Sequence, residues 1–97
     1  MALLMAEAVR WFRLAAEQGN AGGQYGLGVQ YSSGDGVPED MVLGYMWFNI
    51  AAAQGLEGAQ SGKDIIEERM AREQIGEAQR MSREWIEART SGLEDGN

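Results

Sequence analysis

The chain has 97 residues, which is enough for one small domain built on a single hydrophobic core. Its eight basic and fifteen acidic side chains give a formal net charge of −7, which repels phosphate backbones and anionic membrane surfaces. The sequence contains no cysteine and no histidine, so it lacks thiol chemistry, the usual general base and the commonest metal ligand. We therefore expect no nucleic-acid partner, no membrane partner, no metal site, no cofactor and no catalytic activity.

The first expected helix spans about Ala2 to Gln18. Its apolar residues share one helical face because they follow the spacing i, i+3, i+4, i+7. These residues are Leu4, Ala8, Trp11, Phe12 and Ala15. Gly19 is placed to end the helix in a left-handed conformation, and Asn20 can then cap a second helix over about residues 21–32. The pattern predicts a tight helical hairpin.

The stretch from Trp11 to Gln24 recurs from Trp47 to Gln60, at an offset of 36 residues. Eight of the fourteen aligned positions are identical, whereas ordinary composition gives about one by chance. An internal repeat of this length is typical of a stacked helical array, in which each unit needs a neighbour to cover its apolar face.

The second unit begins after the loop at residues 34–38, with a helix expected from Glu39 or Asp40 up to Gly55. The next expected helix, at about residues 57–70, departs from the repeat because Lys63 and Glu67 replace an apolar and an aromatic residue. A last helix at about 72–89 has one apolar face and a charged face, which suits a terminal cap.

We therefore predict one domain over residues 1–89. It consists of repeat one at about 4–39, a partial repeat two at about 40–70 and a capping helix at about 72–89. Residues 90–97 are polar and acidic and contain glycine, so we expect a disordered tail.

The repeated helices contain two spaced runs of residues. They are Ala8-x-x-Trp11-Phe12-x-x-Ala15-Ala16-x-Gln18-Gly19-Asn20 and Gln24-x-x-Leu27-Gly28-x-x-Tyr31-x-x-Gly34-x-Gly36-Val37, with Asp40 following. Together they resemble the Sel-one-like repeat, a relative of the tetratricopeptide repeat. This resemblance implies an all-α, right-handed α-α solenoid of two helix pairs and a C-terminal capping helix. It also implies an adaptor or scaffold that binds a peptide or protein segment in a short concave groove, without catalysis.

The resemblance also implies roles for individual residues. Trp11, Phe12, Trp47 and Phe48 are expected to pack in the core. The opposite helix face is expected to line the groove, through Arg10, Arg13 and Glu17 in the first unit and Met46, Asn49 and Ala53 in the second. For Arg10 and Arg13, a solvated helix face is the default interpretation, and a groove that meets an acidic segment is the alternative to it.

The amino-terminal edge suggests a second hypothesis, because nothing in the sequence precedes the first helix to cover its apolar residues. The edge consists of Met1, Leu3, Leu4, Met5 and Val9. We expect self-association into a homodimer through this edge, although a partner protein would serve equally well. The alternative function is therefore a self-assembling structural module that needs no foreign ligand.

The remaining motifs argue against an enzyme. Adjacent carboxylates such as Glu67 and Glu68 point about 100° apart on a helix and cannot act as a catalytic pair. The apolar start of the chain is interrupted by Glu7 and Arg10 before a membrane span or signal sequence of adequate length forms. We accordingly expect a cytoplasmic protein.

Overall fold

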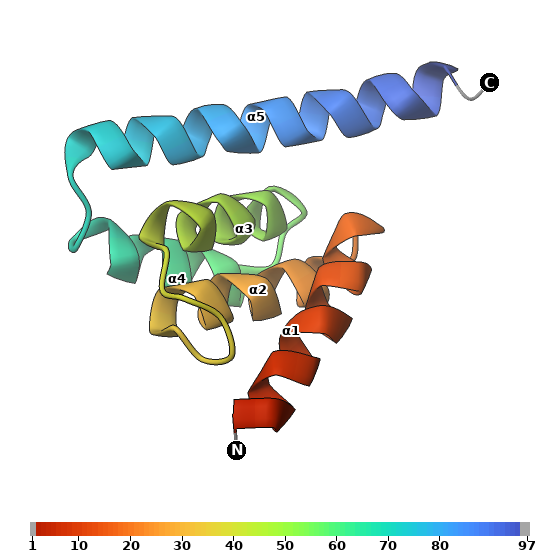
Figure 1. The fold of residues 1–97 in the computed structure, drawn as a ribbon. Coiled ribbons are helices and arrows are strands. Elements are labelled where there is room, and N and C mark those ends of the chain that lie inside the picture. The colour runs from red at the N-terminus through yellow and green to blue at the C-terminus, as the bar shows by residue number, and fades with distance from the viewer. Residues whose placement is uncertain (1, 96–97) are drawn as a thin grey trace.

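The structure is a computed structural model that describes residues 2–95, a range that contains five helices and no strand. The helices are α1 (Ala2–Glu17), α2 (Ala21–Ser33), α3 (Met41–Ala53), α4 (Glu57–Glu67) and α5 (Arg72–Asp95). Two short helical hairpins are followed by one longer helix, so the predicted all-α solenoid is confirmed (Figure 1).

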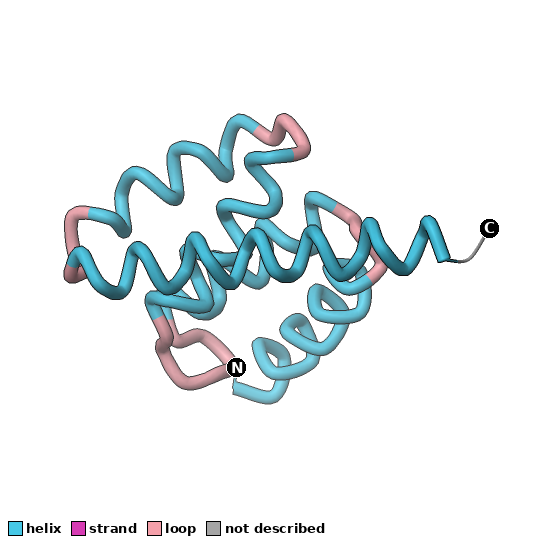
Figure 2. Tube along the Cα trace, turned by 90° about the horizontal axis from the view of Figure 1, so that it is seen from above, coloured by secondary structure: helices cyan, strands magenta, loops and turns pink. Residues whose placement is uncertain are grey.

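The helices stack in the order expected of a repeat array. Helix α2 packs against α1 on one side and α3 on the other, and α3 in turn packs against α4 and α5. Figure 1 shows α5 above α3, with the amino-terminal end of α1 farthest from α5 and its carboxyl end rising toward it. Seen from above, α5 runs across the other helices (Figure 2). Helix α3 is therefore enclosed on several sides, whereas α1 has only α2 as a major neighbour.

Local sequence signals mark both hairpin turns and the beginnings of α2 and α3. Gly19 and Gly55 follow the first helix of each unit and have φ angles of 89° and 93°, a region that only glycine adopts without strain. Asn20 and Asp40 are the N-caps of α2 and α3, and each side chain accepts a hydrogen bond from the backbone N–H three residues later. These caps satisfy helix N–H groups that would otherwise lack partners.

The core has two clusters, and α3 contributes to both. The first consists of Val9, Ala16, Leu27, Tyr31, Met46, Trp47 and Ile50. The second consists of Tyr45, Phe48, Ala51, Ala59, Ile66 and Ala78. Because successive helical residues point about 100° apart, one side of α3 packs in the first cluster and the other side packs in the second. Helix α3 therefore connects the two clusters.

Glycines let the helices approach the phenylalanines of the repeat. A Cβ atom on Gly26 would lie 2.7 Å from the ring of Phe12, and a Cβ atom on Gly62, its repeat equivalent, would lie 2.8 Å from Phe48. A Cβ atom on Gly28 would also meet Phe48, at 2.5 Å. Phe48 is thus enclosed between α2 and α4.

The predicted end of the capping helix is wrong. Helix α5 does not stop at Arg89 but continues to Asp95, through most of the segment expected to be disordered. Extending a helix that has already formed fixes only one residue for each added hydrogen bond, so polar residues can prolong it without a packed face. Residues 96 and 97 of the predicted tail lie outside the described residues.

Candidate protein-binding surfaces

The predicted groove residues of the first unit are exposed on α1. These are Arg10, Arg13 and Glu17. The Nη2 atom of Arg13 donates a hydrogen bond of 2.8 Å to the hydroxyl of Tyr31, which ties this side chain to α2. Arg13 therefore supports the hairpin as well as facing solvent.

The predicted groove residues of the second unit are placed differently. Met46 is buried beneath α5, where its backbone oxygen accepts a hydrogen bond of 3.4 Å from Ser82. Asn49 is half-buried and accepts a hydrogen bond of 3.1 Å from Lys63 of α4. The prediction that Met46 lines an open groove is wrong, because α5 covers that face of α3. With Met46 buried, the six predicted groove residues do not form one continuous surface.

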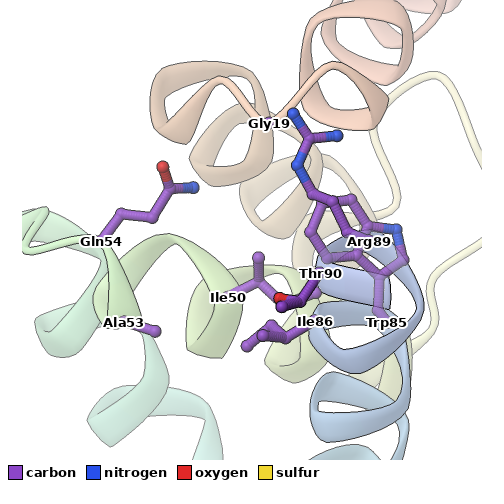
Figure 3. A pocket seen from close by; sticks show the side chains of 8 residues that line it. All are labelled: Gly19, Ile50, Ala53, Gln54, Trp85, Ile86, Arg89 and Thr90. Atoms are coloured by element: carbon purple, nitrogen blue, oxygen red, sulfur yellow. The ribbon is translucent and has the colours of Figure 1, made fainter. Parts of the chain in front are cut away.

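A concave surface does exist where the first turn, the end of α3 and α5 meet (Figure 3). Its volume is about 240 Å³. It is lined by Gly19, Ile50, Ala53, Gln54, Trp85, Ile86, Arg89 and Thr90. We call this the junction cavity. It includes Ala53, which the repeat pattern placed in the groove.

The junction cavity has an apolar floor and a polar rim. Ile50, Ala53, Trp85 and Ile86 supply apolar atoms from α3 and α5, as Figure 3 shows. Polar groups stand around them on Gln54, Arg89 and Thr90. Apolar walls with a few polar groups are typical of binding pockets in general, and at protein–protein interfaces such pockets are filled by anchor side chains of the partner.

Arg89 connects α5 to the end of α1. Its Nη1 and Nη2 atoms donate hydrogen bonds of 3.0 and 2.7 Å to the backbone oxygens of Glu17 and Gln18. These carbonyls lie at the carboxyl end of α1, where the helix leaves acceptors unpaired and favours a positive charge. A Cβ atom on Gly19 would displace this guanidinium group, which is the flexible end of an exposed side chain, so the φ angle of 89° is what favours glycine there.

Gln54 lines the junction cavity and is hydrogen-bonded to a second glutamine buried behind it. The Nε2 atom of Gln54 donates a hydrogen bond of 2.7 Å to Oε1 of Gln24, which is fully buried. The Nε2 atom of Gln24 donates in turn to the backbone oxygen of Ala16, at 3.2 Å. This chain of hydrogen bonds joins α3, α2 and α1 and holds Gln54 in place.

The α5 residues of the junction cavity were only partly predictable. Trp85 and Ile86 belong to the apolar face expected of the capping helix, and Arg89 and Thr90 follow four residues after them. Helical spacing would therefore have extended this face to Thr90. The hydrogen bonds from Arg89 to α1 join segments far apart in the sequence and left no local signal.

The predicted self-association edge is only partly exposed. Leu4 is 64% exposed, but Met5 is half-buried and Val9 is 5% exposed within the first core cluster. The prediction for Val9 is wrong because this residue faces α2 and α3. Met1 lies outside the described residues, as does the side chain of Leu3.

The apolar surface of α1 lies on a different face. Trp11 is 70% exposed and Leu14 is 52% exposed, so the expectation that Trp11 packs in the core is wrong. Glu7, Arg10, Trp11 and Leu14 line a shallow groove of about 360 Å³. We call this the α1 groove. No helix in residues 2–95 covers it, which explains why this tryptophan remains at the surface.

Among residues 4–92, the Tyr45 hydroxyl is the one group whose pKa clearly departs from its ordinary value. Burial raises the pKa of its hydroxyl, and the hydrogen bond of 2.8 Å that it donates to Glu67 raises it further. The Nε2 atom of Gln79 donates a hydrogen bond of 3.3 Å to the hydroxyl oxygen of Tyr45. Tyr45 is a buried link between α3, α4 and α5. Glu67, which replaces the tyrosine of the first unit, therefore accepts a hydrogen bond that joins α4 to α3.

The described residues lack both a metal-binding cluster and a membrane-spanning helix. No three acidic side chains there gather closely enough to form a metal site. Within the same residues, no helix has both the length and the apolar character needed to span a bilayer.

Comparison with protein families gives a match to the Sel1 repeat at residues 5–20 and 21–56, which together make up more than half of the chain. The second match spans α2 and α3 together with the loop that joins them. No curated protein gives a significant match. Sel1 repeats form helical solenoids that generally mediate protein–protein interactions and are not themselves catalytic. The chain therefore belongs to the Sel1 repeat family.

Proposed function

We propose that this domain is an adaptor that binds a short segment of a partner protein at the junction cavity, without a catalytic role. The observation that carries the proposal is the cavity itself, with its apolar floor and polar rim. Membership in a family of interaction modules supports the general role. A cytoplasmic location remains a prediction from the sequence.

The junction cavity is a preformed binding site. Three separate parts of the chain define it, and hydrogen bonds from Arg89 and Gln54 hold those parts together. A partner segment would therefore meet a surface that needs little rearrangement, which reduces the entropy lost on binding. Its volume of about 240 Å³ suits an apolar side chain as the anchor, with the flanking peptide on the polar rim.

A selection from a random-peptide phage library would test this proposal. We expect peptides with an apolar anchor to be enriched on the wild-type domain. Ala53→Arg should weaken the selected peptides at least tenfold in fluorescence polarisation, because the long charged side chain fills the cavity. Ile65→Glu is the matched control, since Ile65 is an exposed apolar residue of α4 outside the cavity.

Two results would contradict the proposal. One is a selection that yields no specific peptide. The other is a set of peptides whose affinity Ala53→Arg leaves unchanged while the variant remains folded by circular dichroism.

A further inference from the structure

The α1 groove combines exposed apolar side chains with charges of both signs. Trp11 and Leu14 supply the apolar surface, and Leu4 extends it by two turns toward the amino end. Glu7 and Arg10 lie on the same helix, between Leu4 at one end of this surface and Leu14 at the other. Neither charge makes an ion pair or a side-chain hydrogen bond with the side chain of another residue in the range 4–92. The surface therefore offers both an apolar contact and unused charges to an incoming group.

The internal repeat indicates what kind of group fits this surface. The four residues that line the α1 groove have repeat equivalents on α3, at the offset of 36 residues. The equivalents are Leu43, Met46, Trp47 and Ile50, and all four belong to or pack against the first core cluster. Helix α5 covers them, with Trp85 meeting Trp47 edge-on at a centroid distance of 5.6 Å. This face of the repeat thus holds an α-helix in the second unit.

We propose that the α1 groove binds α1 of a second copy of the chain, in an antiparallel arrangement about a two-fold axis. Leu4 and Leu14 are placed symmetrically about Val9 along the helix, and Glu7 and Arg10 are placed symmetrically about almost the same point. In an antiparallel pair, Leu4 of each copy meets Leu14 of the other. Each Glu7 likewise lies beside the opposite Arg10. A two-fold interface requires this kind of self-complementary pattern.

The distribution of charge also favours α1 as the meeting point. The whole chain carries −7, so most apposed surfaces would repel each other. The side chains of helix α1 include two glutamates and two arginines, so their charges cancel. Two copies can therefore approach through α1 with little net repulsion. A single pair of helices buries a small area compared with the roughly 1,600 Å² of a typical stable interface, so the dimer should be weak.

Sedimentation equilibrium on the full chain over a wide concentration range tests the proposal. The wild type should show a monomer–dimer equilibrium, and Leu14→Glu should remove the dimer. Glu7→Arg and Arg10→Glu should each weaken dimerisation at least tenfold, because each creates like-charge contacts across the axis. An equimolar mixture of these two variants should regain the dimer. In the mixed pair, one chain is basic at both positions and the other is acidic at both, so every contact across the axis joins opposite charges.

Ile65→Glu serves as the matched control and should dimerise like the wild type, because Ile65 lies on α4. Circular dichroism should show all variants folded, since every substituted side chain is exposed. A wild type that stays monomeric would overturn the proposal and leave the groove to a helix from another protein. A dimer that survives Leu14→Glu, or charge variants that are not rescued by mixing, would also overturn it. These outcomes are independent of peptide binding at the junction cavity.

Discussion

Helices α1 and α3 carry the same Trp-Phe motif, yet Trp11 is 70% exposed whereas Trp47 is only 8% exposed. The difference comes from the neighbours of each helix. Helix α3 is covered by α2, α4 and α5, while α1 packs mainly on α2. In a repeat array, the same side chain is a core residue or a surface residue depending on whether the next element covers it.

The largest expected difference between the two units lies in the tryptophans themselves. Trp47→Ala should lower the free energy of unfolding by about 3–5 kcal/mol, because it empties a packed site between α3 and α5. Trp11→Ala should change it by less than about 1 kcal/mol, since most of that side chain already contacts water. Urea unfolding followed by circular dichroism measures both. Equal losses would show that the two helices are covered to the same extent in solution.

The second-largest expected difference is in the stability lost when the equivalent glutamines of the two units are replaced by alanine. Gln24→Ala should cost about 1–3 kcal/mol, because Gln54 and a backbone carbonyl lose their buried hydrogen-bond partner. Gln60, its repeat equivalent, is exposed, and its side chain donates a hydrogen bond of 3.0 Å to Asp64 on the surface of α4. Gln60→Ala should therefore shift the midpoint of urea unfolding very little. A small effect at position 24 would mean that water replaces the lost hydrogen bonds.

The glycine contacts allow a finer comparison. Gly28→Ala should destabilise the domain by about 1–2 kcal/mol, because the clash with Phe48 outweighs the gain of up to about 1 kcal/mol in helix propensity. Gly26→Ala should cost less, since Phe12 is only half-buried and its ring can shift. Thermal melting of the two variants measures the difference. The reverse order would show that α1 holds its phenylalanine more rigidly than α3.

The smallest expected effect is a pH dependence of stability. It arises in the second unit alone, because Tyr45 can ionise whereas Val9, its repeat equivalent, cannot. Because the folded-state pKa of Tyr45 is raised above 10.0, the folded domain keeps this proton more tightly than the unfolded chain. The full contribution to stability is present below pH 10 and is lost as the pH rises through the folded pKa. Spectrophotometric titration near 295 nm should show a component above pH 10 that Tyr45→Phe removes. If the component that Tyr45→Phe removes instead titrates at pH 10 or below, burial does not raise the pKa of Tyr45.

Much of the fold was predictable because the signals are local. The turn glycines, the capping residues Asn20 and Asp40 and the offset between the units placed four helices within a few residues of their observed ends. The extent of α5 was not predictable in this way, since polar residues at a helix end carry little preference.

The candidate sites were less predictable because they depend on tertiary contacts. Met46 was assigned to a groove, but the course of α5 decides its burial. Val9 was assigned to an open edge, although its repeat equivalent Tyr45 is also a core residue and could have indicated the inward face. The composition of a helix face is visible in the sequence, whereas the element that covers it is not.

The hydrogen bonds from Arg89 to the end of α1 affect how the domain unfolds. Repeat arrays with contacts only between neighbouring units can lose their terminal helices one at a time. Here the last helix is bonded to the turn that ends the first, across a separation of 71 and 72 residues. Separation of α5 therefore exposes the end of α1 together with the face of α3. This connection favours a single cooperative unfolding transition over gradual fraying from the carboxyl end.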